Sequence, residues 1–276
     1  MNGPLRLELQ PIGLAPSTAA PGALPDARQP GLVLAYLELG VAETQHGEAA
    51  RLGNALEPHA RPPRVRAAKR LRQPIDRLAS LAAGVLVDVM AAPLFRGGRA
   101  PIDVAPNGKP DFKAGTGAHF NLSHSRSAVC CAIGAQPVGI DVEPIVRDYE
   151  DIRDLCLTEC ESGYVEARAS RSERARAFTR IWTRKEALGK WLGCGLENAV
   201  LHADMLRWPC GYEKALLGQC PGIFASPAPS VSTFDARNAC VSVCGNGPAR
   251  IVTMTLTELL SAASALPAAS WKGDWT

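Results

Sequence analysis

The sequence predicts a mixed α/β (α+β) fold, because short apolar runs typical of strands alternate with longer segments that carry apolar residues at helical spacing. The chain has 276 residues, of which 46% are hydrophobic, enough for a sizeable core in one large domain or two smaller lobes. Both halves of the chain contain both kinds of segment. The expected strands cover residues 31–40, 128–134, 138–145, 239–244 and 250–256. The expected helices cover residues 47–57, 64–71, 75–90 and 174–191.

The helix expected at 75–90 is the most distinctive element of the first half. Its apolar residues share one helical face, which indicates a helix buried against a sheet; they are Leu78, Leu81, Ala82, Val85 and Val89. Pro58 and the pair Pro62–Pro63 interrupt the chain before this helix. The segment 92–117, rich in proline and glycine, should form loops and short strands.

Capping residues mark the helix boundaries of the second half. Thr158 followed by Glu161 matches a capping box. Gly193 and Gly195 should end the helix at 174–191. Proline, alanine and glycine dominate the first thirty residues, and Gln136–Pro137 is a plausible junction. We therefore expect a flexible tail at 1–30, lobes at 31–137 and 138–260, and a C-terminal tail at 261–276.

Composition and charge argue against several classes of protein. The formal net charge of +3 is too small for bulk nucleic-acid binding. No apolar run approaches the ~20 residues that span a bilayer, and the N-terminus lacks the order of a secretory signal. The nine cysteines, including the CxxxC pairs Cys156/Cys160 and Cys240/Cys244, match neither a disulfide framework nor a zinc ribbon. We expect a cytoplasmic protein that binds neither nucleic acid nor membrane.

Asp141 and Glu143 form the first candidate site. Residues two apart on a strand point to the same face, so Val138, Ile140 and Val142 should point into a core. The two acids should then point together to the other side. Neighbouring carboxylates repel each other, and a cation between them removes that cost; oxygen ligands alone favour Mg²⁺ or Mn²⁺. Taken alone, this pair is more simply a solvated strand face.

A second candidate lies on the helix at 174–191. Trp182, Glu186 and Lys190 are spaced four residues apart and share one helical stripe. Glu186 and Lys190 alone could form an exposed ion pair that contributes ~0.3–0.5 kcal/mol. The tryptophan on the same stripe indicates that part of the helix is buried, and a buried acid needs a partner.

Three further segments carry polar or basic groups that also have simpler explanations. Ser123 and His124 precede a strand and could contact a phosphate, although a lone histidine is more often structural, and no G-x-S-x-G elbow accompanies them. Lys109 lies in a turn, where a lysine is usually only solvated. A basic stretch that could equally be a solvated helix face contains Arg61, Arg64, Arg66, Lys69, Arg70 and Arg72.

Taken in order, these segments form a recognisable series. The motifs are Gly108-Lys109-Pro110, Phe120-Asn121-Leu122-Ser123-His124-Ser125, Gly139-Ile140-Asp141-Val142-Glu143, Leu157-Thr158 with Glu161, and Trp182-Thr183-Arg184-Lys185-Glu186-Ala187 followed by Lys190 and Gly193-Cys194-Gly195-Leu196. Each motif alone is weak, but the order and spacing together are specific. Over roughly residues 31–200 the chain resembles the Sfp-type 4'-phosphopantetheinyl transferase family.

The resemblance implies an enzyme that transfers the 4'-phosphopantetheine arm of coenzyme A to a serine of an apo acyl or peptidyl carrier protein. Adenosine 3',5'-bisphosphate is the leaving group. The family fold is a pair of similar α/β lobes related by a pseudo-twofold axis, with coenzyme A in the cleft between them. Members usually act as monomers and often serve secondary metabolite biosynthesis. Their carrier proteins are acidic, and the basic stretch could steer one.

By the same resemblance, Asp141, Glu143 and Glu186 would hold Mg²⁺, with Mn²⁺ as an alternative. Lys190 would contact the phosphate of the pantetheine arm, and Glu186 would be the base for the serine hydroxyl, directly or through a water. Lys109, Ser123 and His124 would contact the nucleotide phosphates of coenzyme A. Arg64 would contact its 3'-phosphate, with Ser80 as a weaker match and Arg66 or Lys69 as substitutes for Arg64.

A few positions depart from the family pattern. Ala67 stands where the family often has a basic residue, and Cys194 stands where it often has a charged residue. Gly189 lies inside the catalytic helix, where it should cost about 1 kcal/mol relative to alanine.

Two other functions could use the same carboxylates. A metal-dependent phosphoesterase would need a second cluster rich in His and Asp, and a non-catalytic coenzyme A-binding protein would lack a carboxylate.

Overall fold

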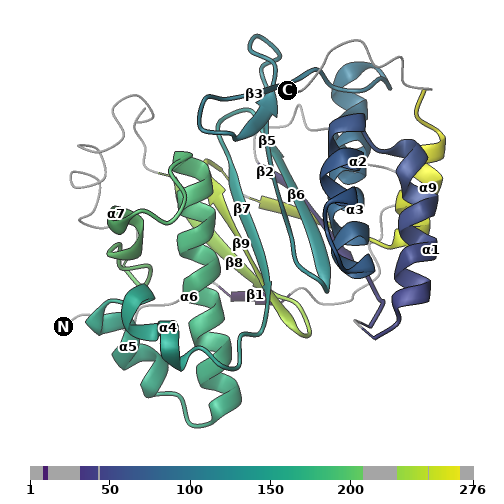
Figure 1. Cartoon of the computed structure of the whole chain (residues 1–276). Helices are drawn as coiled ribbons and strands as arrows, with labels where there is room; N and C mark the ends of the chain where they lie inside the picture. Colours follow the sequence, from purple (N-terminus) through teal and green to yellow (C-terminus); the bar gives the residue numbers. More distant parts are fainter. Residues whose placement is uncertain (1–8, 12–31, 43, 208–228, 248, 268–276) are drawn as a thin grey trace. The chain divides into compact units, whose positions relative to one another are not determined.

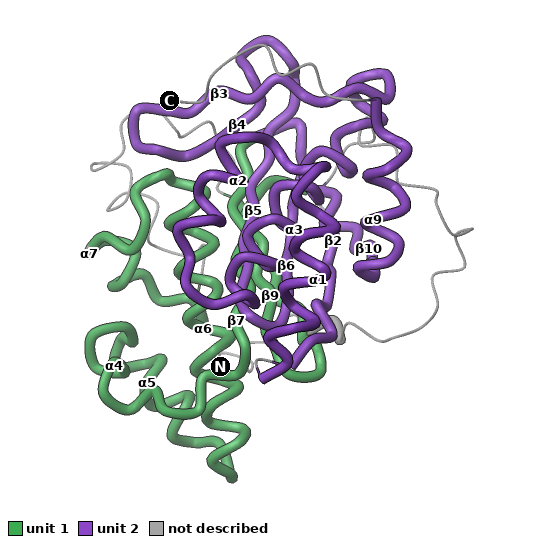
Figure 2. The backbone as a smooth tube through the Cα atoms, turned by 45° about the vertical axis from the view of Figure 1, so that its right-hand side comes forward, with its two compact units in different colours: residues 1–14, 137–247 green, residues 15–136, 248–276 purple. Residues whose placement is uncertain are grey.

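In the computed structural model the chain divides into two units, each built around its own four-stranded sheet (Figure 1). Unit 1 comprises residues 1–14 and 137–247, and unit 2 comprises residues 15–136 and 248–276 (Figure 2). The structure describes residues 9–11, 32–42, 44–207, 229–247 and 249–267. Both units combine helices with strands, so the predicted mixed α/β class is confirmed.

The sheet of unit 2 has the strand order β10-β2-β6-β5. Its strands are β2 (Leu32–Glu38), β5 (His119–His124), β6 (Ala128–Gly134) and β10 (Ala249–Met254). β6 runs antiparallel to both β2 and β5, whereas β10 pairs in parallel with β2. Every residue of β6 is buried, which explains its continuous apolar sequence.

Helix α3 covers this sheet and forms the core of unit 2. The other elements around it are α1 (His46–Leu56), α2 (Pro62–Lys69), α3 itself (Pro74–Ala91), α9 (Leu256–Ser264), two 3₁₀ turns (Glu57–His59 and Ala92–Phe95), β3 (Ile102–Val104) and β4 (Pro110–Phe112). α3 packs on β5 and β6 and is in turn contacted by α1, α2 and α9. The predicted apolar face of the segment 75–90 is confirmed, because all five of its named residues are buried.

The segment Pro74–Phe95, which contains α3, is 22 residues long and is the one helix among the described residues that could cross a membrane by length and composition. This differs from the expectation that no apolar run approaches such a length. In the structure, 83% of its most apolar window is buried inside the protein. A core helix of a globular domain has the same properties, and the packing of α3 on β5 and β6 is of that kind.

A buried carboxylate on α3 anchors the chain around it. Asp88 is 0% exposed and accepts hydrogen bonds from Arg61 and Arg99, each at 2.5 Å. Arg61 also donates to the carbonyl of Ala100 at 2.6 Å. Arg61, the first residue of the basic stretch, therefore has a structural role rather than lying on a solvated face.

Unit 1 contains the second sheet, with the strand order β1-β8-β9-β7. Its elements are β1 (Leu9–Pro11), β7 (Gly139–Pro144), β8 (Ser230–Asp235), β9 (Ala239–Gly245), α4 (Glu150–Cys156), α5 (Glu159–Glu166), α6 (Arg171–Leu192) and α7 (Asn198–Leu201). β9 is antiparallel to β7 and β8, and β1 is parallel to β8. The long helix α6 packs against β7, β8 and β9.

The two sheets repeat one topology. In each unit a first strand is followed by helices and later by two strands that form a hairpin, although in unit 2 the separate pair β3 and β4 comes between. Among these three strands the sheet order is first, third, second: β2-β6-β5 and β7-β9-β8. Each sheet then receives an edge strand from a distant part of the chain. β10, expected in the C-terminal lobe, completes unit 2, and β1, expected in the flexible tail, completes unit 1. An added edge strand pairs backbone groups that the edge would otherwise leave open.

Capping boxes determine where two helices of unit 1 begin. The box predicted at Thr158 and Glu161 is confirmed. A second box, formed by Ser170 and Glu173, starts α6 three residues before the predicted start at 174. The first turn of α6 is polar and carries no apolar periodicity, so the sequence pattern missed it. The helix ends as predicted at Gly193, which has a φ of 77°.

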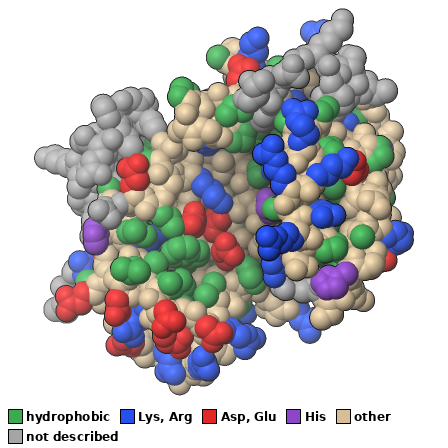
Figure 3. All heavy atoms as spheres, viewed as in Figure 1, with side chains coloured by type: hydrophobic (Ala, Val, Ile, Leu, Met, Phe, Trp, Pro, Cys, Tyr) green, Lys and Arg blue, Asp and Glu red, His purple; other side chains and the backbone are tan. Residues whose placement is uncertain are grey.

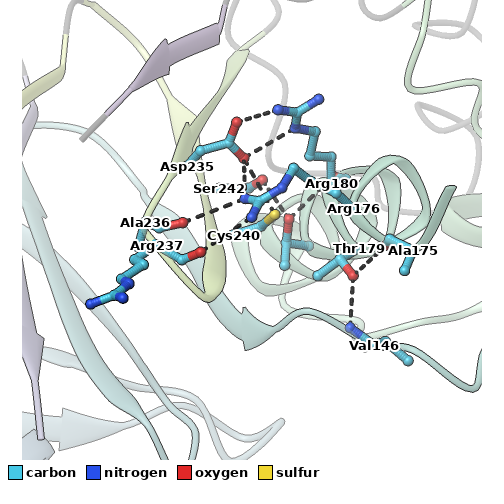
Figure 4. Close-up of polar contacts among 11 residues, drawn as sticks. Val146, Ala175, Arg176, Thr179, Arg180, Asp235, Ala236, Arg237, Cys240 and Ser242 are labelled. Atoms are coloured by element: carbon cyan, nitrogen blue, oxygen red, sulfur yellow. Dashed lines mark hydrogen bonds and ion pairs between the residues drawn. The ribbon is translucent and has the colours of Figure 1, made fainter. Parts of the chain in front are cut away.

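Polar contacts fasten α6 to the hairpin of β8 and β9 (Figure 4). Asp235 on β8 forms ion pairs with Arg180 and, at 3.6 Å, with Arg176. Arg176 also donates to two carbonyls in the hairpin turn. Farther along the helix, the hydroxyl of Thr183 lies 2.8 Å from the hydroxyl of Ser242 on β9. Together these contacts fix the rotation of α6 about its own axis.

Glu161 and Lys185 form a fully buried ion pair with a separation of 2.8 Å. Glu161 also accepts a hydrogen bond from the backbone N–H of Met205 at 2.7 Å, and Lys185 donates to the carbonyl of Leu201. The pair therefore joins α5, α6 and the segment after α7. The sequence indicated no role for Lys185, and the structure gives it this structural one.

The first prediction concerns the approach of β7 to α6 at Gly139. A Cβ atom there would lie 2.1 Å from the carbonyl oxygen of Ala187 and 2.4 Å from the backbone nitrogen of Trp191. Because both atoms belong to the backbone, Gly139→Ala should lower the free energy of unfolding by about 3 kcal/mol in urea titrations. Gly163→Ala on α5 is the control, since nothing lies within 4 Å of its Cβ position. Equal unfolding midpoints for the two variants would show that the strand and helix are farther apart.

The second prediction concerns the buried pair. Lys185→Met leaves the carboxylate of Glu161 buried without its cation, so unfolding in urea should become easier by about 3–5 kcal/mol. Adding Glu161→Gln removes the uncompensated charge and should restore part of that loss. Asp148→Asn removes an exposed partner of Arg171 and should change stability little. A double variant no more stable than Lys185→Met would contradict this account.

Candidate active site on β7 and α6

Strand β7 turns its acidic residues toward α6. Side chains alternate along a strand, so Asp141 and Glu143 share the face of Gly139, and Gly139 packs directly against the helix. Asp141 is 2% exposed and Glu143 is half-buried. Considered alone, the sequence pattern favoured a solvated face for the two acids. The structure places that face against a helix, because Gly139 has no side chain to keep the helix away.

Lys190 contacts this acidic face from α6. Its ammonium lies 2.6 Å from Oδ1 of Asp141. Glu186 lies one turn earlier on the helix and Trp182 one turn before that, and all three residues of the stripe are half-buried. The predicted partial burial of the stripe is therefore confirmed. The ion pair itself was not predicted, although a buried acid on one segment and a lysine on the other were visible in the sequence.

Burial and nearby charge raise the pKa of both glutamates of the site. Burial, followed by the charge of Asp141, raises the pKa of Glu143 to about 7, while Lys190 opposes the rise and Glu186 adds to it. Burial and then Asp141 also raise the pKa of Glu186, and Lys190 again opposes the rise. The ammonium of Lys190 thus leaves part of the repulsion uncompensated. A further cation would remove it.

The donor set fits a hard divalent cation by its chemistry. Asp141, Glu143 and Glu186 supply carboxylate oxygens only, the ligands that Mg²⁺ and Mn²⁺ prefer. In the parts of the chain that the structure describes, no three His, Cys, Asp or Glu side chains are already gathered closely enough to hold a metal ion. Asp141 is paired with Lys190 instead. The site therefore contains suitable ligands together with a lysine counter-ion.

Two contacts order the end of α6. A Cβ atom at Gly189 would lie 2.2 Å from the carbonyl oxygen of Gly195, which explains a glycine inside the helix. The indole N–H of Trp191 donates to the carbonyl of Pro137, just before β7, at 2.9 Å. The first contact packs the segment after α6 against the helix, and the second joins the turn that carries Lys190 to the start of β7.

Three of the residues predicted to contact coenzyme A lie on β5 and in the turn before β4, in unit 2. Lys109 is half-buried and follows Gly108, whose φ of 82° requires a glycine. On β5, Ser123 is 6% exposed, whereas His124 is exposed at the end of the strand. Their roles toward coenzyme A stay predictions.

Arg64 and Ser80 lie on α2 and α3 of unit 2, which pack together. Arg64 is half-buried, and burial lowers the pKa of its guanidinium. Ser80 is 3% exposed, so its hydroxyl lies inside the unit. Arg66 and Lys69 are exposed, and Lys69 pairs with Glu57 at 2.7 Å. Basic side chains gather over this part of unit 2 (Figure 3). The contacts of these residues to coenzyme A also stay predictions.

Comparison with known families identifies the segment that carries the acidic site. A family model described as the 4'-phosphopantetheinyl transferase superfamily matches residues 137–219. This range contains β7 and α6, and with them Asp141, Glu143, Glu186 and Lys190.

Three curated relatives match longer stretches of the chain. The 4'-phosphopantetheinyl transferase AcpT of Salmonella typhi is 37% identical over 124 residues, which are 44% of this chain and 62% of that protein. The transferase Sfp of Bacillus subtilis strain 168 is 33% identical over 103 residues, 35% of this chain and 46% of Sfp. AcpT of Escherichia coli O157:H7 is 32% identical over 140 residues, 48% of this chain and 71% of that protein. The matched length and the family model together show that the chain belongs to the 4'-phosphopantetheinyl transferase superfamily.

Proposed function

We propose that this protein transfers the 4'-phosphopantetheine arm of coenzyme A to a serine of an apo acyl or peptidyl carrier protein. The observation that carries the proposal is the arrangement of Asp141, Glu143, Glu186 and Lys190 on β7 and α6, within the segment that matches the superfamily. The relatives are named for this transfer. Their names support neither a phosphoesterase nor a coenzyme A-binding protein without catalysis.

Mg²⁺ is the proposed cofactor, with Mn²⁺ as an alternative. Asp141, Glu143 and Glu186 are its proposed ligands. The charge of Asp141, which raises the pKa of both glutamates, supports this assignment, because the three acids carry more negative charge than Lys190 compensates. Bound there, the cation would stabilise negative charge on the pyrophosphate of coenzyme A.

The reaction requires a serine hydroxyl of the carrier protein to lose a proton and attack the β-phosphorus of coenzyme A. A new P–O bond forms to the serine while the bond to adenosine 3',5'-bisphosphate breaks, and this group leaves. Glu186 is the proposed base, and Lys190 would stabilise the charge that develops on the phosphate oxygens. Both residues lie on α6 one turn apart, so the helix fixes the position of the Glu186 carboxylate relative to the Lys190 ammonium.

Other parts of the proposal rest on the family resemblance. The proposed contacts to the nucleotide phosphates are Arg64, Ser80, Lys109, Ser123 and His124, all in unit 2. The repeated strand order supports the proposal of two similar lobes; a pseudo-twofold relation and a cleft for coenzyme A stay part of it. So do a monomeric state, a cytoplasmic location without nucleic-acid or membrane partners, and a role in secondary metabolite biosynthesis.

The third prediction tests the proposed base. Glu186→Gln keeps the shape of the side chain but removes the group that accepts the serine proton, so transfer should slow by about 10²–10⁴-fold. The rate is measured as the mass gain of an apo carrier protein incubated with coenzyme A and Mg²⁺. Glu186 is half-buried, so the substitution should leave the melting temperature unchanged or raise it.

Glu166→Gln on α5 is the matched control for this variant. Glu166 is an exposed glutamate of the same unit, paired with Arg153, and its loss should not affect transfer. Transfer by Glu186→Gln at the rate of the wild type would contradict the role of Glu186. Equal losses in both variants would point to a general effect of removing negative charge.

The fourth prediction concerns the ion pair between Lys190 and Asp141. Without the competing ammonium, Lys190→Met should bind Mg²⁺ more tightly in the absence of coenzyme A, by about 1 kcal/mol or roughly fivefold in Kd. Isothermal titration calorimetry with MgCl₂ measures this directly. Asp141→Asn should instead weaken Mg²⁺ binding. Unchanged or weaker binding by Lys190→Met would show that the lysine does not compete for the carboxylate.

A further inference from the structure

Three arginines form a stripe along α6, and they share a single carboxylate among the residues that the structure describes. Arg176, Arg180 and Arg184 are spaced four residues apart, so they lie on one side of the helix. Asp235 on β8 forms ion pairs with Arg180 and, at 3.6 Å, with Arg176 (Figure 4). Arg184 has no ion pair within the described ranges. The stripe therefore carries more positive charge than its acid compensates.

Burial increases along this stripe toward Arg184. The side chains of Arg176 and Arg180 are 31% and 15% exposed, whereas Arg184 is 6% exposed. A guanidinium keeps its charge inside a protein. Taking that charge out of water is costly unless an opposite charge compensates it. In the described part of the chain, the most desolvated cation of the stripe is thus the one that lacks an acid.

Neutral groups give Arg184 only weak compensation. Its Nη1 donates to the hydroxyl of Thr233 at 3.4 Å, and its Nε is buried without a hydrogen-bond partner. The hydroxyl of Thr233 is also shared with that of Ser242, which lies 2.9 Å away. The charge of Glu161 reaches Arg184, but Lys185 already pairs with Glu161 at 2.8 Å. None of these described contacts brings an uncompensated negative charge to the guanidinium.

Arg180 shows the binding mode that is left unused in Arg184. Nε of Arg180 donates to Oδ1 of Asp235 at 3.0 Å, and its Nη2 pairs with Oδ2. This edge of a guanidinium holds two oxygens of one anion side by side. In Arg184 the Nε of the same edge has no partner. An anion that presents two neighbouring oxygens suits this edge in the way that a carboxylate suits Arg180.

We infer that Arg184 binds a small inorganic oxyanion of the phosphate class between α6 and β8. The guanidinium supplies the charge and the paired donors for two of its oxygens. Arg184 and Glu186 are two residues apart and so lie on opposite sides of the helix, which separates this site from the acidic face of β7. The bound anion would stabilise the helix that carries Glu186 and Lys190. The inference does not depend on the proposed reaction.

Urea unfolding of the full chain tests the site, with sodium phosphate as the probe at constant ionic strength. Phosphate at ten times its calorimetric Kd should lower the unfolding equilibrium constant of the wild type about tenfold, and the gain should saturate. Arg184→Met should show no gain. Without phosphate this variant should be at least as stable as the wild type, because methionine fills the space without the desolvated charge. Chloride should stabilise the wild type less, since one atom does not match two paired donors.

Two further variants separate this site from other places where phosphate could bind. Arg171→Met removes an exposed arginine of the same helix and should keep the full gain. Thr233→Asp places a carboxylate beside the guanidinium of Arg184 and should lose the gain, because the side chain then takes the place of the anion.

Loss of the phosphate gain in Arg184→Met and Thr233→Asp, with the gain retained in Arg171→Met, supports the inference. A gain that persists in either of the first two variants, or that disappears in Arg171→Met, overturns it, because phosphate then acts elsewhere. No gain in the wild type, or an equal gain from chloride, overturns it as well. So does a marked loss of stability in Arg184→Met without phosphate, since the guanidinium would then already be compensated.

Discussion

The close approach of β7 to α6 is the constraint on which the candidate site depends. At Gly139 the strand comes so near the helix that a single Cβ atom would meet the backbone at Ala187 and Trp191. Because side chains alternate, the same approach turns Asp141 and Glu143 toward the helix and brings Asp141 to Lys190. The contacts to the β8–β9 hairpin and the buried pair of Glu161 and Lys185 fix the orientation of the helix about its own axis. The alternating pattern alone would also fit a solvated strand face. The absence of a side chain at Gly139 lets the helix approach that face.

Two buried carboxylates have ion-pair partners that hold elements together. Asp88 is held by two arginines, and Glu161 by one lysine and a backbone N–H. The acids around Lys190 have more negative than positive charge. Matched pairs are typical of structural roles, whereas a mismatch of charge is costly unless a ligand compensates it. This contrast supports the cation proposed beside Lys190.

Much of the fold could be predicted from the sequence, since strong periodicity and caps mark it. The face of α3, the capping box at Thr158 and the end of α6 at Gly193 are cases of this kind. The edge strands β1 and β10 could not, because long-range pairing leaves no local pattern and β1 has only three residues. Within the site, residue types and order identified the acids and Lys190. The ion pair of Lys190 and the packing role of Gly139 depend on distances between elements far apart in sequence, which spacing alone does not encode.

The proposed reaction is the transfer of phosphopantetheine to a serine of a carrier protein. The most direct measurement is the stoichiometry of the wild-type reaction with coenzyme A, Mg²⁺ and a panel of apo acyl and peptidyl carrier proteins. We expect one phosphopantetheine on the serine of a carrier protein for each adenosine 3',5'-bisphosphate released, and neither product when the metal is chelated. Release of the nucleotide without modification of any carrier protein, or no reaction with the whole panel, would contradict the account.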